Sequence, residues 1–184
     1  MSNRIWIFAI VILSLTGVIV RISSFRPLRN FHEIDPGKFY RSAQLTPEEL
    51  RQITKMYGIR TVINLRGRQT GKSWYENQKS TLNEMGVPQV DIAFDSDTVP
   101  QRVRLMRYLN TLKNSERPIL IHCRSGADRT GLSSAIYMYD YMGASKEEAE
   151  TQMSSDYLHL ENFKPAKKHF FDHYKGYDWA KNEY

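Results

Sequence analysis

Cysteine is nearly absent from this sequence: the chain of 184 residues contains one, Cys123. A single cysteine excludes an intramolecular disulfide, so the cysteine content gives no argument for an oxidising compartment. Histidine and cysteine also form no cluster with the spacing of metal ligands. We therefore expect a domain that needs no disulfide, no metal and no other cofactor, because a chain of this length can bury a substantial core without them.

Acidic residues are missing from the first part of the chain. Residues 1–29 contain four arginines and no aspartate or glutamate, whereas the whole chain has 26 basic and 20 acidic residues. Most of the formal charge of +6 therefore belongs to this segment, and the remainder has a net charge of only +2. A broad basic face of the kind that binds nucleic acid is not indicated.

Long apolar runs are rare as well, and the one present covers residues 5–20, between Arg4 and Arg21. A membrane-spanning helix needs about 20 apolar residues, with a range of about 17–25, so this run just qualifies if Arg21 reaches back to the interface. A cleaved signal peptide is the rival interpretation, although no small-residue cleavage site follows Val20. A buried core helix is the third. We predict an anchor or signal-like segment with a linker at 1–29, and a globular domain at 30–184.

The most informative stretch runs from Pro118 to Gly131. Its apolar triplet at 119–121 is typical of a strand that is covered on both faces. Apolar residues then recur at helical spacing from Leu132 to Met142, and Gly143 is placed to end that helix. Between the two lies a short loop in which an arginine follows the cysteine by six positions.

A loop that leads from a strand into a helix N-terminus can hold an anion. Its backbone N–H groups and the helix dipole bind a phosphate dianion, and the same field favours a thiolate over a thiol at Cys123. Arg129 has the planar fork that grips two phosphate oxygens, which lysine lacks. Gly126 allows a tight backbone path, and Thr130 can donate its hydroxyl to the sulfur when the thiolate leaves. The alternative is a buried, inert cysteine.

The residues from 122 to 131 read His-Cys-x-x-Gly-x-x-Arg-Thr-Gly, which resembles the signature loop of the cysteine-dependent protein tyrosine phosphatase superfamily, in its bacterial dual-specificity-like branch. The sequence segments 40–43 and 62–66 resemble the same family, so the resemblance covers roughly residues 37–143. It implies hydrolysis of phosphomonoesters through a phosphocysteine on Cys123, with Arg129 catalytic and no metal. The remaining residues of the loop would bind the phosphate group: Arg124, Ser125, Gly126, Ala127, Asp128 and Thr130.

A general acid must protonate the leaving oxygen, and this family supplies an aspartate from a loop ahead of the signature. Asp97 matches that place best, 26 residues before Cys123, and Asp95 is the runner-up. Either aspartate could instead cap a helix expected at 100–113. Arg66 lies on a basic loop after an expected strand, where it could attract and bind anionic substrate or simply be solvated.

Strand and helix signals alternate along the chain, which favours an α/β fold. We expect a three-layer sandwich with a mostly parallel central sheet flanked by helices, dual-specificity-phosphatase-like. Thr46 and Ser145 each begin a helix with a capping-box pattern. Residues 23–36 are interpreted as a linker and entry loop, and 39–42 as an edge strand. Further strands are expected at 61–65 and 87–93, and further helices at 74–85 and 165–174.

The default substrate implied by the resemblance is a phosphotyrosine protein, cleaved by a dual-specificity enzyme. The pair Asp128-Arg129 also resembles relatives that act on phosphoinositides, and Arg124 adds a cation, so a phosphoinositide or inositol phosphate is the alternative substrate. Asp128 could instead brace the loop by hydrogen bonding. An inactive phosphate-binding module and a sulfurtransferase are the rival functional classes. His159, His169 and His173 lack partners by sequence and are expected to be structural or exposed.

The anchor predicts attachment to a membrane, which the resemblance suggests is the bacterial inner membrane. Basic residues follow the apolar run, and the positive-inside rule would keep the domain cytoplasmic. Bacterial tyrosine phosphatases that follow a signal-like segment work in the periplasm, however. The side of the membrane therefore stays open.

Overall fold

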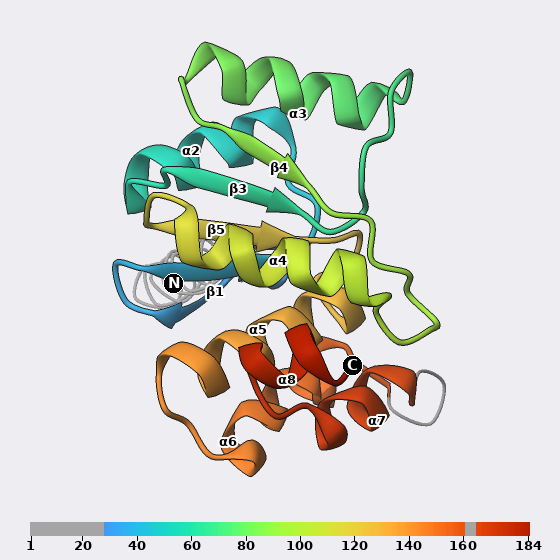
Figure 1. The fold of residues 1–184 in the computed structure, drawn as a ribbon. Coiled ribbons are helices and arrows are strands. Elements are labelled where there is room, and N and C mark those ends of the chain that lie inside the picture. Colours follow the sequence, from blue (N-terminus) through green and yellow to red (C-terminus); the bar gives the residue numbers. More distant parts are fainter. Residues whose placement is uncertain (1–27, 161–164) are drawn as a thin grey trace, which may run out of the picture.

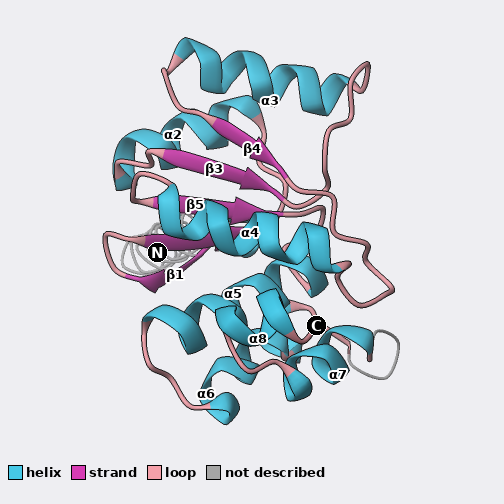
Figure 2. Ribbon diagram, in the orientation of Figure 1, coloured by secondary structure: helices cyan, strands magenta, loops and turns pink. Residues whose placement is uncertain are grey.

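The computed structural model of the chain describes residues 28–160 and 165–184. Its centre is a five-stranded sheet with the strand order β1-β2-β5-β3-β4 (Figures 1 and 2). β1 (His32–Asp35) runs antiparallel to β2, and the remaining strands are parallel to one another: β2 (Phe39–Ser42), β5 (Ile119–His122), β3 (Thr61–Asn64) and β4 (Gln89–Asp91). The predicted α/β fold with a mostly parallel sheet is confirmed.

Helices cover both faces of this sheet. α2 (Pro47–Tyr57) and α3 (Ser73–Glu84) pack on one face, against Val62 and Leu120. α4 (Arg102–Asn114) and α5 (Asp128–Tyr141) pack on the other, against Ile119 and Ile121. Because successive strand residues point to opposite faces, the apolar triplet of β5 contributes to both cores. The three-layer arrangement is therefore confirmed.

Three short helices complete the α5 side of the molecule: α6 (Lys146–Glu150), α7 (Ala166–His173) and α8 (Tyr177–Asn182). α6 and α7 contact α5, and α8 contacts α4. α7 corresponds to the helix predicted at 165–174, whereas α8 was not predicted. Single-turn 3-10 helices lie at Leu28–Asn30, Thr151–Met153 and Ser155–Tyr157.

Both predicted capping boxes are present. The Thr46 hydroxyl accepts a hydrogen bond from the backbone N–H of Glu49 at 3.2 Å, and the Glu49 carboxylate accepts one from the Thr46 N–H at 2.7 Å. Ser145 and Glu148 form the same reciprocal pair at the start of α6. These bonds satisfy N–H groups that a helix start otherwise leaves without partners, which is why the pattern could be recognised locally.

Two predictions at the beginning of the domain are wrong. Residues 23–36 are not all linker, because His32–Asp35 forms β1 and the backbone oxygen of Arg29 accepts a hydrogen bond from the N–H of Ala43 at 2.7 Å. β2 is not an edge strand, because it lies between β1 and β5 with all four residues buried. β1 takes the edge position instead, and its polar sequence hid it from pattern analysis.

The apolar run at 5–20 lies outside the described residues. Within 28–160 and 165–184, no helix is both long enough and apolar enough to cross a bilayer.

Candidate active site

The predicted strand, loop and helix meet at the carboxyl end of the central strand. β5 ends at His122, α5 begins at Asp128, and the loop between them carries Cys123, whose side chain is buried. Arg129 therefore lies in the first turn of α5, where the helix dipole adds partial positive charge. The helix begins four residues earlier than the first apolar position that predicted it.

Three successive carbonyl oxygens of this loop accept hydrogen bonds from residues that lie outside it. The Arg124 oxygen accepts a hydrogen bond from the Gln44 N–H at 3.2 Å, and the Ser125 oxygen accepts one from the Asn30 amide at 3.1 Å. The Gly126 oxygen accepts one from the Arg41 guanidinium at 2.6 Å. Because these carbonyls point away from the loop's interior, the peptide N–H groups can face inward and form an anion-binding nest.

Gly126 is the residue that lets this loop lie against β2. Its φ of +75° is in the left-handed region, and a Cβ there would sit 2.8 Å from the Ala43 nitrogen and 2.9 Å from the Ser42 carbonyl carbon. No L-side chain fits that approach without moving backbone atoms. The predicted reason for glycine at this position is thus supported by the geometry.

Arg41 is the most important site residue that the sequence analysis overlooked. It is fully buried beneath the loop and donates to Gly126 as well as to the backbone and side-chain oxygens of Gln152, at 2.9 and 2.7 Å. Its guanidinium also stacks on the Tyr157 ring, 4.0 Å from the centroid. Burial lowers the pKa of Arg41 to about 10, while charge on the nearby Cys123 opposes this shift, so the group remains a cation at neutral pH.

His122 is held neutral behind the nucleophile. The amide nitrogen of Gln78 can only donate, so it donates to Nε2 of His122 at 2.9 Å, and Nδ1–H then donates to the Cys123 carbonyl at 3.2 Å. Complete burial lowers the pKa of His122 to about 4. The ring therefore orients the loop without carrying charge above about pH 5.

Asp128 braces the loop through a partner that was not predicted. Its Oδ1 lies 2.8 Å from Nδ1 of His159, whose side chain is wholly buried. His159 is thus structural, one of the two expected alternatives, and the bracing alternative for Asp128 is the one that the structure supports. The two residues are 31 positions apart, so local sequence could not reveal the pair.

Arg66 belongs to the same site rather than to bulk solvent. Its guanidinium stacks on Trp74, 3.6 Å from the ring centroid, and donates to the Gln44 side chain at 3.2 Å. Burial lowers the pKa of Arg66, and the positive charges of Arg129 and Arg124 lower it further. The backbone N–H of Gln44 also donates to the Arg124 oxygen, so Gln44 connects Arg66 to the loop.

Comparison with known proteins agrees with this geometry. Residues 23–172 match the model of the family described as a DSP-PTPase phosphatase fused to NAD+ kinase. The chain belongs to this DSP-PTPase phosphatase family. The human dual specificity protein phosphatase CDC14C is 30% identical over 95 residues, which cover 52% of this chain and 20% of that relative, so the chain spans about a fifth of its length.

Solved structures of phosphatases share the fold of this DSP-PTPase chain. P. aeruginosa TpbA in complex with pTyr superposes with a TM-score of 0.65 at 21% identity, over 80% of this chain and 85% of that one. The core catalytic domain of the S. cerevisiae PP-IP phosphatase SIW14, in complex with citrate, superposes with a TM-score of 0.62 at 17% identity, over 79% and 85%. The predicted membership of the cysteine-dependent superfamily is confirmed.

The aspartate loop of the DSP-PTPase domain lies between β4 and α4. Asp95 uses Oδ1 to accept hydrogen bonds from the N–H groups of Asp97 and Thr98, at 2.7 and 3.1 Å. Oδ2 of Asp97 accepts one from the Ser96 hydroxyl at 2.9 Å. Neither aspartate caps α4, whose N-cap is Gln101 without a side-chain bond. Asp95 therefore stabilises the turn on which Asp97 lies.

Lys167 ties this aspartate loop to α7. Its buried ammonium donates to the backbone oxygen of Asp95 at 2.7 Å and also to the backbone oxygen of Thr98. The loop is thus positioned by a residue 72 positions further along the chain. Lys167 is a second contributor that the sequence analysis missed, because a lysine in a helix gives no local sign of being buried.

Two further loop residues are buried. Ala127 is the N-cap of α5, and Thr130 lies in the first turn of that helix. The Thr130 hydroxyl has no hydrogen-bond partner among the described residues, the sulfur of Cys123 included. Within the described ranges, no group of three or more histidine, cysteine, aspartate or glutamate side chains could hold a metal ion.

Proposed function

We propose that this chain is a cysteine-dependent phosphatase that hydrolyses phosphomonoesters through a phosphocysteine intermediate. The observation that carries the proposal is the set of three loop carbonyls, of Arg124, Ser125 and Gly126, that are bound from outside around the buried Cys123. Such a loop offers N–H groups to the equatorial oxygens of a phosphoryl group and stabilises negative charge that develops on them.

The reaction has two displacement steps. The Cys123 thiolate attacks phosphorus, the bond from phosphorus to the ester oxygen breaks, and the Asp97 carboxyl protonates that leaving oxygen. The resulting Asp97 carboxylate then takes a proton from water, which attacks phosphorus and expels the thiolate with release of inorganic phosphate. Arg129 and the loop N–H groups hold the transferred group in both steps, and Thr130 donates to the leaving sulfur in the second.

Phosphotyrosine in a protein is the substrate class that we propose first, as for a dual-specificity enzyme. The nucleophile has only 1% of its surface exposed, so a substrate phosphate has to reach down into the loop. A phenyl phosphate is long and narrow enough to do so. Binding of pTyr by the structurally similar TpbA supports the same choice.

An inositol phosphate or phosphoinositide is the second candidate. The specific observation in its favour is that Gln44 holds Arg66 beside the loop that carries Arg124 and Arg129. Three cations near one loop are more than one phosphate group needs. The similar fold of SIW14, named a PP-IP phosphatase, supports this alternative.

The test compares hydrolysis of para-nitrophenyl phosphate, phosphotyrosyl peptides, inositol phosphates and phosphoinositides by the full-length chain and by Cys123→Ser. We expect turnover by the wild type, insensitive to EDTA, and none by Cys123→Ser, which should still bind phosphate. Substantial activity in Cys123→Ser would disprove the covalent mechanism. Phosphate binding without turnover by the wild type would indicate an inactive module, and turnover of thiosulfate instead would indicate a sulfurtransferase.

We further propose that the apolar run at 5–20 attaches the phosphatase to a membrane, as its length and flanking arginines indicate. Full-length protein should then sediment with membranes, and a form starting at residue 30 should not. Mature protein that lacks about the first twenty residues would show a cleaved signal instead.

A further inference from the structure

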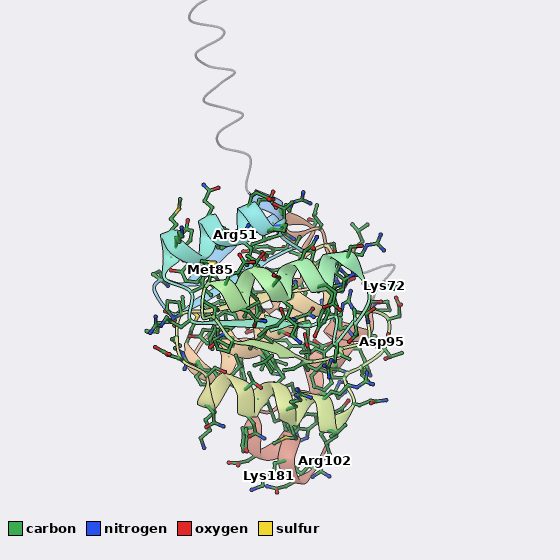
Figure 3. The ribbon with its side chains drawn as sticks, turned by 90° about the horizontal axis from the view of Figure 1, so that it is seen from above. Arg51, Lys72, Met85, Asp95, Arg102 and Lys181 are labelled. Atoms are coloured by element: carbon green, nitrogen blue, oxygen red, sulfur yellow. The ribbon has the colours of Figure 1, made fainter. Side chains whose placement is uncertain are left out.

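A second polar cavity lies at the β4 edge of the sheet, away from the catalytic loop. It has a volume of about 580 Å³, within the range of about 300–1,000 Å³ that is usual for small-molecule sites. Its lining comes from the loop after β3, from α3, from β4 and from α4, and includes no residue of the loop 123–129. Figure 3 looks onto this edge from above, with α3 and α4 running along either side of the strand.

Four cationic side chains line this cavity: Arg68, Lys79, Arg104 and Arg107. Within the described part of the chain, none of the four forms an ion pair with a carboxylate. Arg104 is half-buried and held against the cavity wall, where it donates to the backbone oxygen of Ala93 at 2.6 Å. Four unpaired cations around one cavity repel one another, and an anion would relieve that repulsion.

Asp91, the one acidic residue in the lining, offsets only one of the four positive charges. Its Oδ1 accepts hydrogen bonds from the side-chain amides of Asn64 and Gln89, each at 2.8 Å, and its Oδ2 accepts one from the Tyr75 hydroxyl at 2.5 Å. Both oxygens are therefore engaged with neutral donors from the fold itself. The field inside the cavity remains positive.

The backbone of β4 adds polar groups to the cavity, both N–H donors and carbonyl acceptors. The Pro88 oxygen accepts from the Val62 N–H, and the Ile92 N–H donates to the Asn64 oxygen, so residues 88 and 92 face β3. By the alternation of a parallel ladder, the backbone groups of Gln89 and Asp91 point away from β3. β4 is the last strand in the sheet, so these groups open toward the cavity side.

The two arginines on either side of Gly67 lie in different surroundings. Gly67 is so close to Ala93 that a Cβ on it would be 2.5 Å from the Cβ of Ala93, and both residues line the cavity. Arg66 donates to Gln44, whose N–H binds the Arg124 oxygen of the loop 123–129, whereas Arg68 lines the cavity.

We propose that the cavity at the β4 edge is a second anion-binding site, which takes a small ligand bearing two or more phosphate groups. Four cations match the charge of such a ligand better than that of a single phosphate dianion, and the volume exceeds what one phosphate fills. Its lining shares no residue with the loop 123–129, so a ligand bound there is not needed for hydrolysis and acts on the enzyme from a separate site.

The test uses inorganic pyrophosphate as the probe, titrated at constant ionic strength into ¹⁵N-labelled full-length Cys123→Ser protein in neutral detergent. Amide signals of residues 89–93 and of the loop 123–129 are followed separately. We expect the two groups to saturate with different dissociation constants. Lys79→Ala/Arg107→Ala should weaken binding at 89–93 by at least about tenfold and leave the loop unaffected, whereas Arg129→Ala should do the reverse.

Two controls keep the result specific. Lys55→Ala/Lys175→Ala removes the same two charges from exposed positions elsewhere and should change neither constant. Folding of the double variant is checked by its para-nitrophenyl phosphate turnover in a chain that retains Cys123. If that turnover is lost, Arg68→Ala, on an exposed loop, repeats the test. The proposal would be overturned if pyrophosphate did not shift the signals at 89–93, or if their shifts were lost in Arg129→Ala. It would also be overturned if the cavity variants bound pyrophosphate at 89–93 with the same dissociation constant as Cys123→Ser alone.

Discussion

Arg41 offers the sharpest test of how the fold supports the nucleophile. The variants Arg41→Met and Arg41→Lys separate its two contributions. Methionine fills similar space without a charge or a donor, whereas lysine keeps the charge but loses the planar fork. Both remove the set of bonds that ties β2 to the catalytic loop and to Gln152.

The loss of stability can be estimated from the contacts. Three hydrogen bonds from a charged group contribute about 1.5–3 kcal/mol each. Against this, burial lowers the pKa of Arg41 from 12.5 to about 10, which corresponds to a cost of roughly 3 kcal/mol for keeping the cation inside. We therefore expect Arg41→Met to lower the free energy of unfolding by about 1.5–6 kcal/mol, measured by urea denaturation.

The effect on the nucleophile is measured by alkylation. Because Cys123 is the only cysteine in the chain, the rate of reaction with iodoacetamide at a fixed pH reports on this sulfur alone. Loss of the buried positive charge should slow that reaction in Arg41→Met. Arg41→Lys should react at close to the wild-type rate while sharing the loss of stability.

Folded Arg41→Met that reacts at the wild-type rate would refute this role, because Arg41 would then support the loop only mechanically. An equally slow reaction of Arg41→Lys would mean that the position of the guanidinium, not its charge, decides the reactivity of the sulfur. Unfolding curves recorded under the alkylation conditions establish that each variant is folded.

Asp97→Asn should slow hydrolysis of phosphotyrosine by about 10²–10⁴-fold. It should slow hydrolysis of an activated aryl phosphate much less, because the leaving oxygen of that substrate barely needs a proton. Asp95→Asn is the matched control, and if Asp95→Asn alone showed this dependence on the leaving group, Asp95 would be the acid. Asp128→Asn keeps an acceptor for His159 and should retain kcat/KM and stability, whereas Asp128→Ala leaves that ring unpaired and should cost about 1–3 kcal/mol. Equal losses in both variants would show that charge, not bracing, matters. Burial raises the pKa of Asp140 from 3.8 to about 6, so its contribution to stability is full below about pH 4 and is lost as the pH rises through 6. Asp140→Asn should match the wild type in thermal unfolding near pH 4 and exceed it by about 2–3 kcal/mol at pH 7.5; a constant difference would contradict the assignment.

The sequence by itself determined the catalytic loop and the helices with strong caps. The strand at 119–121, the loop after it and the capping boxes of Thr46 and Ser145 all depend on residues within a few positions of one another. Backbone N–H groups at a helix start have local partners, and a strand buried on both faces is continuously apolar. The phosphate-binding chemistry proposed for Cys123 and Arg129 follows from that same short stretch.

Tertiary structure alone decided what supports the loop. Arg41 lies 85 positions before its partner Gly126 and 111 before Gln152, and Lys167 lies 72 positions after Asp95. Nothing within a turn of these residues distinguishes a buried cation from a solvated one, because burial is set by which elements pack together. The same holds for β1, whose polar residues became a strand only through pairing with β2, and for the cationic cavity, which exists only where α3 and α4 lie on either side of the β4 edge.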